Sequence, residues 1–226
     1  MLEKNSVLSF SSQKNLDINA AQYIIEKAKI AIREKGSFSL VLSGGTTPVN
    51  VYKLLAKEQV NFDKWHIYFG DERFLPLGDA GRNDTMASTV WLNYVAIPRA
   101  HIHGVPVSDD VNTAAAEYAA ILQKAPGFDL ALLGLGEDGH TASLFPGNVP
   151  RSRPAALAIA VTDAPKLPAQ RVSMSAGCLS LSSAVWFIVS GSNKRKMLEA
   201  WLMGAPLPPQ AIKPDAGIDI FTDLDI

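Results

Sequence analysis

Strand-like and helix-like segments alternate along most of this chain, and this alternation constrains the fold more than any other feature of the sequence. Apolar runs such as "FSLVLS" (38–43) and "FDLALLGLG" (128–136) are typical of buried strands. Residues 17–35 are expected to form a helix, with Asp17 as its cap and Gly36 as its stop. Strands that alternate with helices build parallel sheets covered on both faces. The sequence therefore predicts an α/β fold, a Rossmann-like, mostly parallel sheet with helices on both faces.

The remaining elements are expected to follow the same pattern. Pro48 is suited to the first turn of a helix that continues through 49–56. Neither an internal repeat nor a long linker interrupts the chain, so we expect one domain over residues 1–226. Further helices are expected over 83–92, 112–124 and 193–203. Further strands are expected over 65–70, 156–161, 171–175 and 184–190, with 218–223 as a last strand at the edge of the sheet.

The composition excludes several classes of function. The formal net charge of the 226 residues is −1, whereas proteins that bind nucleic acids carry a basic excess. The longest apolar runs fall short of the roughly 18 residues that span a bilayer, and residues 1–15 are too polar for a secretory signal. The single cysteine, Cys178, excludes an internal disulfide and a multi-cysteine zinc site. We expect a cytoplasmic protein with neither a nucleic-acid nor a membrane partner.

Four loops that follow expected strands contain most of the chemically informative residues. They are "SGGTTP" (43–48), "GDERFLP" (70–76), "GLGEDGHTASLFPG" (134–147) and "SGSNKRK" (190–196). Ligands of open parallel sheets bind outside the carboxyl ends of the strands. These loops are therefore expected to meet at one edge of the sheet.

The third of these loops has the glycine spacing of a dinucleotide-binding turn, with Gly134, Gly136 and Gly139 at G-x-G-x-x-G positions. That function requires a helix from the third glycine and an acidic residue about 20 positions later. Pro146 stops the helix early, and residues 155–160 contain no acid, so we reject NAD binding. The loop instead presents His140, whose side-chain type suits general-base catalysis near neutral pH. A purely structural histidine fits the local sequence equally well.

The other loops contain polar groups that favour an anionic ligand. Glycines and hydroxyls ahead of a helix suit an anion, although an ordinary strand–helix turn explains "SGGTTP" as well. Asp71, Glu72 and Arg73 form either an ion-pair network or a site in which Arg73 clamps a phosphate or carboxylate. Arg171 and Lys194 add positive charge at the same edge. Several cations on one edge of a nearly neutral chain favour an anion.

The remaining histidines and the cysteine do not suggest a metal site. His66, His101 and His103 lack the acid or cysteine spacing that completes one, and we expect them to be structural or surface residues. Cys178 is expected to be a small buried apolar residue.

Taken together, these motifs resemble those of the 6-phosphogluconolactonase family. The matching segments are "LSGGTTP", "GDERFLP", "FDLALLGLGEDGHTASLFPG", "DAPKLPAQRVSMS" and "VSGSNKRKML", which occur in family order between about Leu42 and Leu198. "DGHTASLFPG" is the most specific of them. The resemblance implies a fold related to glucosamine-6-phosphate deaminase and ribose-5-phosphate isomerase, with neither a metal nor a nucleotide cofactor.

The resemblance also implies roles for individual residues. His140 would be the general base, and Asp138 would orient its imidazole or shape the loop. The implied substrate and phosphate ligands are Ser43, Gly44, Gly45, Thr46, Asp71, Arg73, Asn83, Arg171 and Lys194. The segment Gly81–Asp84 departs from the family, because many members have Ser-Asn-Tyr where this chain has Arg82, Asn83 and Asp84. Arg82 and Asn83 are also candidates for capping the following helix.

The implied reaction is hydrolysis of 6-phospho-D-glucono-1,5-lactone to 6-phospho-D-gluconate in the oxidative pentose phosphate pathway. The implied partner is therefore a small sugar-phosphate lactone, with the protein a monomer or a weak homo-oligomer. Two other functions are less favoured. The Asn-Glu pair that follows the histidine in the related deaminases is absent from "TASLFPG". A phosphosugar-sensing regulator needs a DNA-binding unit, and the residues before the first helix are too few to form one.

Overall fold

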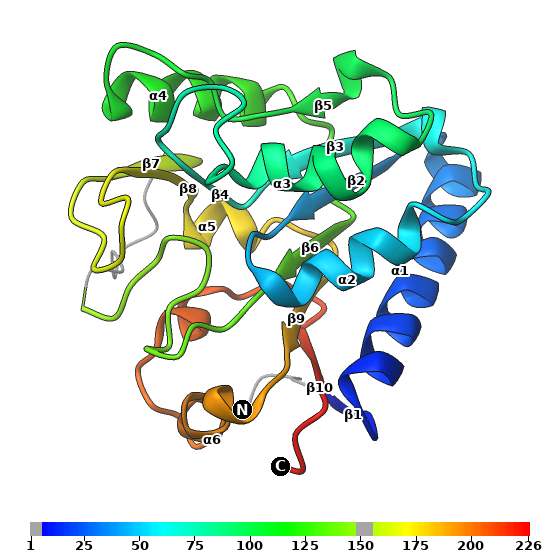
Figure 1. Cartoon of the computed structure of the whole chain (residues 1–226), viewed down its shortest axis with the longest axis vertical. Coiled ribbons are helices and arrows are strands. Elements are labelled where there is room, and N and C mark those ends of the chain that lie inside the picture. The colour runs from blue at the N-terminus through cyan, green and yellow to red at the C-terminus, as the bar shows by residue number, and fades with distance from the viewer. Residues whose placement is uncertain (1–5, 148–155) are drawn as a thin grey trace.

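A seven-stranded parallel sheet forms the centre of the structure, a computed structural model that describes residues 6–147 and 156–226 (Figure 1). Its strand order is β1-β10-β9-β6-β2-β3-β5. The bounds are Ser6–Ser9 (β1), Phe38–Leu42 (β2), Trp65–Phe69 (β3), Ile102–His103 (β5), Leu130–Leu133 (β6), Val185–Val189 (β9) and Ile218–Thr222 (β10). All neighbouring strands in it run parallel. The predicted fold class is confirmed.

Helices cover both faces of this sheet, as expected (Figure 1). Alternate residues of β2 show why: Phe38 and Leu40 pack on one face and Val41 on the other, because successive side chains of a strand point to opposite sides. The first face is covered by α1 (Gln13–Lys35), α2 (Thr46–Leu55) and α3 (Asn83–Val90). The second is covered by α4 (Val111–Gln123), α5 (Ala176–Leu179) and α6 (Arg195–Leu202).

Three strands form a separate antiparallel sheet instead of extending the main one. Its order is β4-β8-β7, with bounds Asp71–Arg73, Arg171–Met174 and Ala158–Val161. The segments 156–161 and 171–175 were expected simply as later strands, and residues 71–76 as a loop. Pairing of Arg73 with Arg171 in this small sheet brings two distant cations next to each other at the edge where the main strands end.

The position of the last strand was predicted wrongly. The segment 218–223 was expected at the sheet edge, but β10 lies between β1 and β9. The edge strand is β1, a short and largely exposed segment that we did not expect. An N-terminal strand that pairs beside a C-terminal one leaves no local signal, because this pairing depends on contacts more than 200 residues apart.

Helix starts also differ from the sequence expectations. Helix α1 begins at Gln13, because Ser12 caps it by accepting a hydrogen bond from the Asn15 amide at 3.3 Å. Asp17, the expected cap, lies one turn inside the helix and is buried. Helix α2 begins at Thr46, two residues before Pro48. Within the described residues no helix is long and apolar enough to cross a membrane.

Three histidines stack at the β3–β5 edge of the main sheet. The ring centroids of His66 and His101 are 4.0 Å apart, and His103 stacks on Tyr68 at 4.4 Å. His66 Nδ1 lies 3.2 Å from His103 Nε2. In the part of the chain that the structure describes, no group of three or more His, Cys, Asp or Glu side chains is arranged to hold a metal ion. The cluster packs as a structural element.

This histidine cluster makes the fold sensitive to acid. Burial, followed by the charges of His66 and His101, lowers the pKa of His103 to about 4, and burial followed by the charge of His101 lowers the pKa of His66. The unfolded chain therefore binds protons first as the pH falls below about 6.5, and stability is lost from there toward the folded-state values. We expect the free energy of unfolding, measured by urea titration, to decrease less in His103→Gln than in the wild type when the pH is lowered from about 7.5 to about 5. Equal losses in both proteins would contradict this explanation.

Candidate active site

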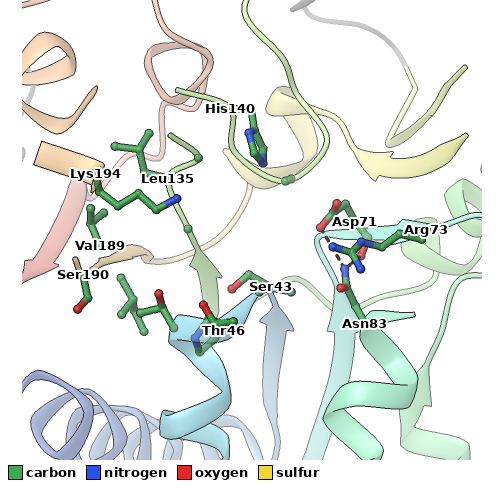
Figure 2. A pocket seen from close by; sticks show the side chains of 18 of the residues that line it. Ser43, Thr46, Asp71, Arg73, Asn83, Leu135, His140, Val189, Ser190 and Lys194 are labelled. Atoms are coloured by element: carbon green, nitrogen blue, oxygen red, sulfur yellow. Dashed lines mark hydrogen bonds between the residues drawn. The ribbon is translucent and has the colours of Figure 1, made fainter. Parts of the chain in front are cut away.

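The loops that follow β2, β3, β6 and β9 meet around one cavity of about 190 Å³ (Figure 2). Every predicted site residue except Asp138 lines it, so these segments converge as expected. The lining residues are Ser43, Gly44, Gly45, Thr46, Thr47, Pro48, Asp71, Arg73, Asn83, Gly134, Leu135, Gly136, His140, Ala142, Arg171, Ile188, Val189, Ser190 and Lys194.

The start of helix α2 forms the floor of this cavity in the view of Figure 2. Its N-cap is Gly45, whose φ of 101° is accessible to glycine at little cost. Because a glycine cap has no side chain, the first backbone N–H groups of the helix stay available to a ligand, and the helix dipole favours an anion there. Ser43, just before, is fixed by Tyr52, whose hydroxyl donates to Ser43 O at 2.9 Å and accepts from Ser43 N at 3.1 Å.

A tight glycine turn presents His140 to the cavity. The Gly136 amide donates to His140 O at 2.7 Å, and Gly139 has a φ of 83°. His140 Nδ1 is hydrogen-bonded to the carboxylate of Asp138, which also accepts from the His140 amide at 3.4 Å. A Cβ on Gly136 would lie 2.0 Å from His140 Nδ1, so only glycine leaves room for the imidazole.

The carboxylate of Asp138 fixes the protonation pattern of His140. Burial alone would raise the pKa of Asp138, but the hydrogen bond and charge of His140 and the nearby Lys166 hold it below its usual value. An ionised carboxylate only accepts hydrogen bonds, so the proton of a neutral His140 resides on Nδ1. The second ring nitrogen, Nε2, is then left with a lone pair that can accept a proton.

Among the residues that the structure describes, three cations line the cavity. Arg171 is 5% exposed, donates to Lys166 O at 2.8 Å and lies over the Phe145 ring at 5.7 Å. Arg73 donates to Gly81 O at 2.5 Å, and Figure 2 shows it opposite Lys194 across the cavity. Burial lowers the pKa values of both Arg171 and Lys194. Partly dehydrated cations of this kind bind an anion more strongly than hydrated ones.

Asp71 connects three parts of the cavity wall. It is 6% exposed, and its Oδ2 accepts from Ser143 Oγ at 2.6 Å. Asn83 Nδ2 donates to Asp71 O at 2.8 Å. Ser143 reaches this position from a turn in which Ala142 adopts a φ of 48°, an unusual value for a residue other than glycine. Asp71 is thus held in place by the loop of His140.

Arg82 and Asp84 of the segment Gly81–Asp84 lie outside the cavity lining. Arg82, 1% exposed, pairs with Asp84 through Nε at 2.9 Å and Nη2 at 2.6 Å. Only Asn83 of this segment lines the cavity. The N-terminus of α3 is capped by Glu72, which accepts from the Asn83 and Asp84 amides at 2.7 and 2.9 Å. Burial raises the pKa of Glu72 to about 7, although the two amide donors and the charge of Arg82 act to lower it.

Sequence reasoning missed the apolar part of the wall. Leu135, Ala142, Ile188 and Val189 line the cavity together with Ser190. Ile188 to Ser190 lie at the end of an expected strand. The rule that ligands bind at carboxyl strand ends pointed to them, but no residue type marked them as ligands.

A parallel sheet whose carboxyl edge gathers a histidine–carboxylate pair, three cations and a free helix start defines an enzyme site for a small anionic substrate. Residues 11–221 match the family model described as glucosamine-6-phosphate isomerases/6-phosphogluconolactonase, and the chain belongs to this family.

Individual relatives agree with this assignment. A 6-phosphogluconolactonase of Nostoc sp. is 36% identical over 204 residues, which cover 86% of this chain and 84% of that protein. The crystal structure of 6-phosphogluconolactonase from Thermotoga maritima superposes with a TM-score of 0.89 at 27% identity, covering 97% of this chain and 99% of that one. A monomeric glucosamine-6-phosphate deaminase, 19% identical, shares the fold with a TM-score of 0.83 over 96% of both chains.

Two glycines of the histidine loop provide a matched test of this geometry. A Cβ on Gly136 would collide with His140 Nδ1, whereas a Cβ on Gly134 would meet nothing within 4 Å. We expect Gly136→Ala to break the hydrogen bond between His140 and Asp138, and Gly134→Ala to keep it. The downfield proton NMR signal of the imidazole Nδ1–H reports this bond directly. A signal that persists in Gly136→Ala would contradict the close packing described here.

Proposed function

We propose that this protein hydrolyses 6-phospho-D-glucono-1,5-lactone to 6-phospho-D-gluconate, the lactonase step of the oxidative pentose phosphate pathway. The observation that carries this proposal is that His140, paired with Asp138, lines the same cavity as the start of α2, which is suited to bind an anion. The names of the curated relatives support the choice of substrate. The lining cations and the apolar wall fit a ring that carries a phosphate at one end.

The phosphate group binds at the start of α2 in this proposal. It carries a charge of about −1.5 to −2 at neutral pH, which the helix dipole and the cations Arg73 and Lys194 compensate. Ser43 and the Gly44–Gly45–Thr46 segment contribute backbone and hydroxyl donors. The apolar side chains of Leu135 and Val189 contact the sugar carbons, and C1 comes to lie beside His140.

His140 then acts as the general base. Its Nε2 takes a proton from a water molecule, whose oxygen attacks the C1 carbonyl and forms a tetrahedral intermediate. Asp138 stabilises the imidazolium that results, because it accepts from Nδ1. Arg171, which packs over the same Phe145 ring as the imidazole of His140, and backbone N–H groups stabilise the oxyanion.

Collapse of the intermediate completes the reaction. The C1–O5 bond breaks, the ring oxygen takes the proton from His140 Nε2, and the open-chain acid ionises to 6-phosphogluconate. His140 returns to its neutral form, so neither a metal nor a nucleotide enters this proton balance. Asp71 and Asn83 hold the neighbouring wall and offer hydrogen-bond partners to the sugar hydroxyls.

Substitution of His140 tests the mechanism. Lactone generated freshly by glucose-6-phosphate dehydrogenase is hydrolysed with and without the protein, in EDTA. We expect the wild type to accelerate hydrolysis and His140→Ala to lower kcat by about 10²–10⁴-fold, the usual contribution of a general base. Asp138→Asn is expected to lower kcat less, because it disturbs only the orientation and charge of the imidazole.

Circular dichroism establishes that both variants are folded before they are assayed. A folded His140→Ala with near wild-type kcat would overturn the role of His140. Absence of any acceleration by the wild type would overturn the lactonase proposal, and ammonia release from glucosamine 6-phosphate would then favour the deaminase branch of the family.

The phosphate-binding role is tested at Lys194. We expect Lys194→Met to raise KM by about tenfold or more with a smaller change in kcat, because the charge acts on a group that does not change during the reaction. Lys196→Met, two residues along on the exposed surface, is the matched control and is expected to keep the wild-type KM. An unchanged KM in Lys194→Met would place the phosphate elsewhere in the cavity.

A further inference from the structure

The carboxylate of Asp223, which belongs to none of the sequence motifs, is hydrogen-bonded to one wall of the cavity. Asp223 directly follows β10, and the pairing of Thr222 with Val189 on β9 places it next to Ser190. Ser190 Oγ donates to Asp223 Oδ2 at 2.7 Å, and the Gly191 amide donates to Oδ1 at 3.3 Å. Both oxygens of the carboxylate are therefore bound to the turn that ends β9.

This turn determines where Lys194 points. Gly191 has a φ of 98°, and its carbonyl accepts from the Lys194 amide at 2.9 Å, which closes the short 3-10 turn before α6. Ser190 lines the cavity, but its hydroxyl proton is committed to Asp223. Ser190 thus serves as a tether, and the ligand-facing cation of this segment is Lys194, which Figure 2 shows reaching into the cavity.

A second buried carboxylate contacts helix α2 through one of its oxygens. Asp17 of α1 is 5% exposed and accepts from Asn50 Nδ2 of α2 at 3.1 Å. Burial raises the pKa of Asp17 to about 6, and the charge of Asp223 adds to this effect, so the two carboxylates interact. Asp17 thus links α1 to α2 through Asn50, whereas the turn at Gly191 is bound by Asp223.

We propose that Asp223 is a positioning residue for the phosphate end of the site, which acts by fixing the Ser190–Gly191 turn and with it the ammonium of Lys194. This inference rests on the proposed function, because it assigns Lys194 to the phosphate. It predicts a defect in the binding of the phosphate-bearing ligand, with the chemistry at His140 unaffected. If Asp223 contributed only to folding, its substitution would lower stability but would not raise KM selectively over its effect on kcat.

The test compares Asp223→Ala, Asp223→Asn and the control Asp219→Ala. Asp219 lies on β10, four residues before Asp223, and accepts a hydrogen bond from Ser6 of the edge strand β1, away from the cavity. We expect Asp223→Ala to raise KM for the lactone about tenfold, with kcat within about threefold of the wild type and an unchanged pH profile of kcat. Asp223→Asn keeps one acceptor oxygen and is expected to restore part of the affinity. Asp219→Ala is expected to keep the wild-type KM.

Calorimetric binding of 6-phosphogluconate gives a second readout that needs no turnover. We expect Asp223→Ala to weaken this binding by the same factor as it raises KM. If the wild type hydrolyses no lactone but Asp223→Ala still binds 6-phosphogluconate more weakly than Asp219→Ala, the proposed function fails and the positioning role stands. Unchanged binding in folded Asp223→Ala, or a loss confined to kcat, overturns the positioning role. Asp223→Asn, which preserves side-chain size, decides the question if Asp223→Ala does not fold.

Discussion

Parallel pairing of β2, β3, β6 and β9 is the constraint on which the rest of the structure depends. Parallel strands end at the same edge, whereas antiparallel neighbours would deliver successive loops to opposite edges. Because β2, β6 and β9 are buried along their whole length, their register is fixed by the core on both faces. The loops that follow these strands therefore begin at fixed positions, and residues far apart in the sequence meet in one cavity.

Burying the cations of the cavity costs electrostatic free energy, and nearby carboxylates reduce this cost. Burial lowers the pKa of Arg171, and the adjacent Arg73 adds to the effect, while Asp71 and Asp138 oppose it. Each of these carboxylates is itself held by a neighbour, Asp71 by Ser143 and Asp138 by His140. Such a preformed set of charges stabilises an anionic ligand or transition state without reorganisation during the reaction. The charges of Asp71 and Asp138 thus reduce the cost of burying Arg171, while backbone carbonyls accept its hydrogen bonds.

Local signals in the sequence were sufficient for the parallel sheet and for the loops at its edge, because strand ends and glycines are visible in short segments. For His140 they left a structural role equally open, and only the family resemblance favoured a catalytic one. The inner position of β10, the strand β1 and the separate β4-β8-β7 sheet depend on pairing between distant segments, and no local pattern encodes that choice. The same limit applies to side chains. Arg82 was a candidate for capping α3, yet its buried side chain pairs with Asp84, while the capping carboxylate comes from Glu72 on another element. The tether between Ser190 and Asp223 joins two residues that lie on opposite sides of α6 in the sequence.

The glycine spacing that imitates a dinucleotide-binding turn has a different physical cause here. In a dinucleotide site, glycines let the backbone approach a pyrophosphate. In this loop Gly136 leaves the space that the imidazole of His140 occupies, and Gly139 supplies the left-handed backbone that reverses the chain toward the sheet. Gly44 does the same for a second side chain, because a Cβ there would lie 2.0 Å from Asn83 Oδ1. Gly136 and Gly44 are therefore required because the side chains of His140 and Asn83 pack directly against their backbone and line the cavity.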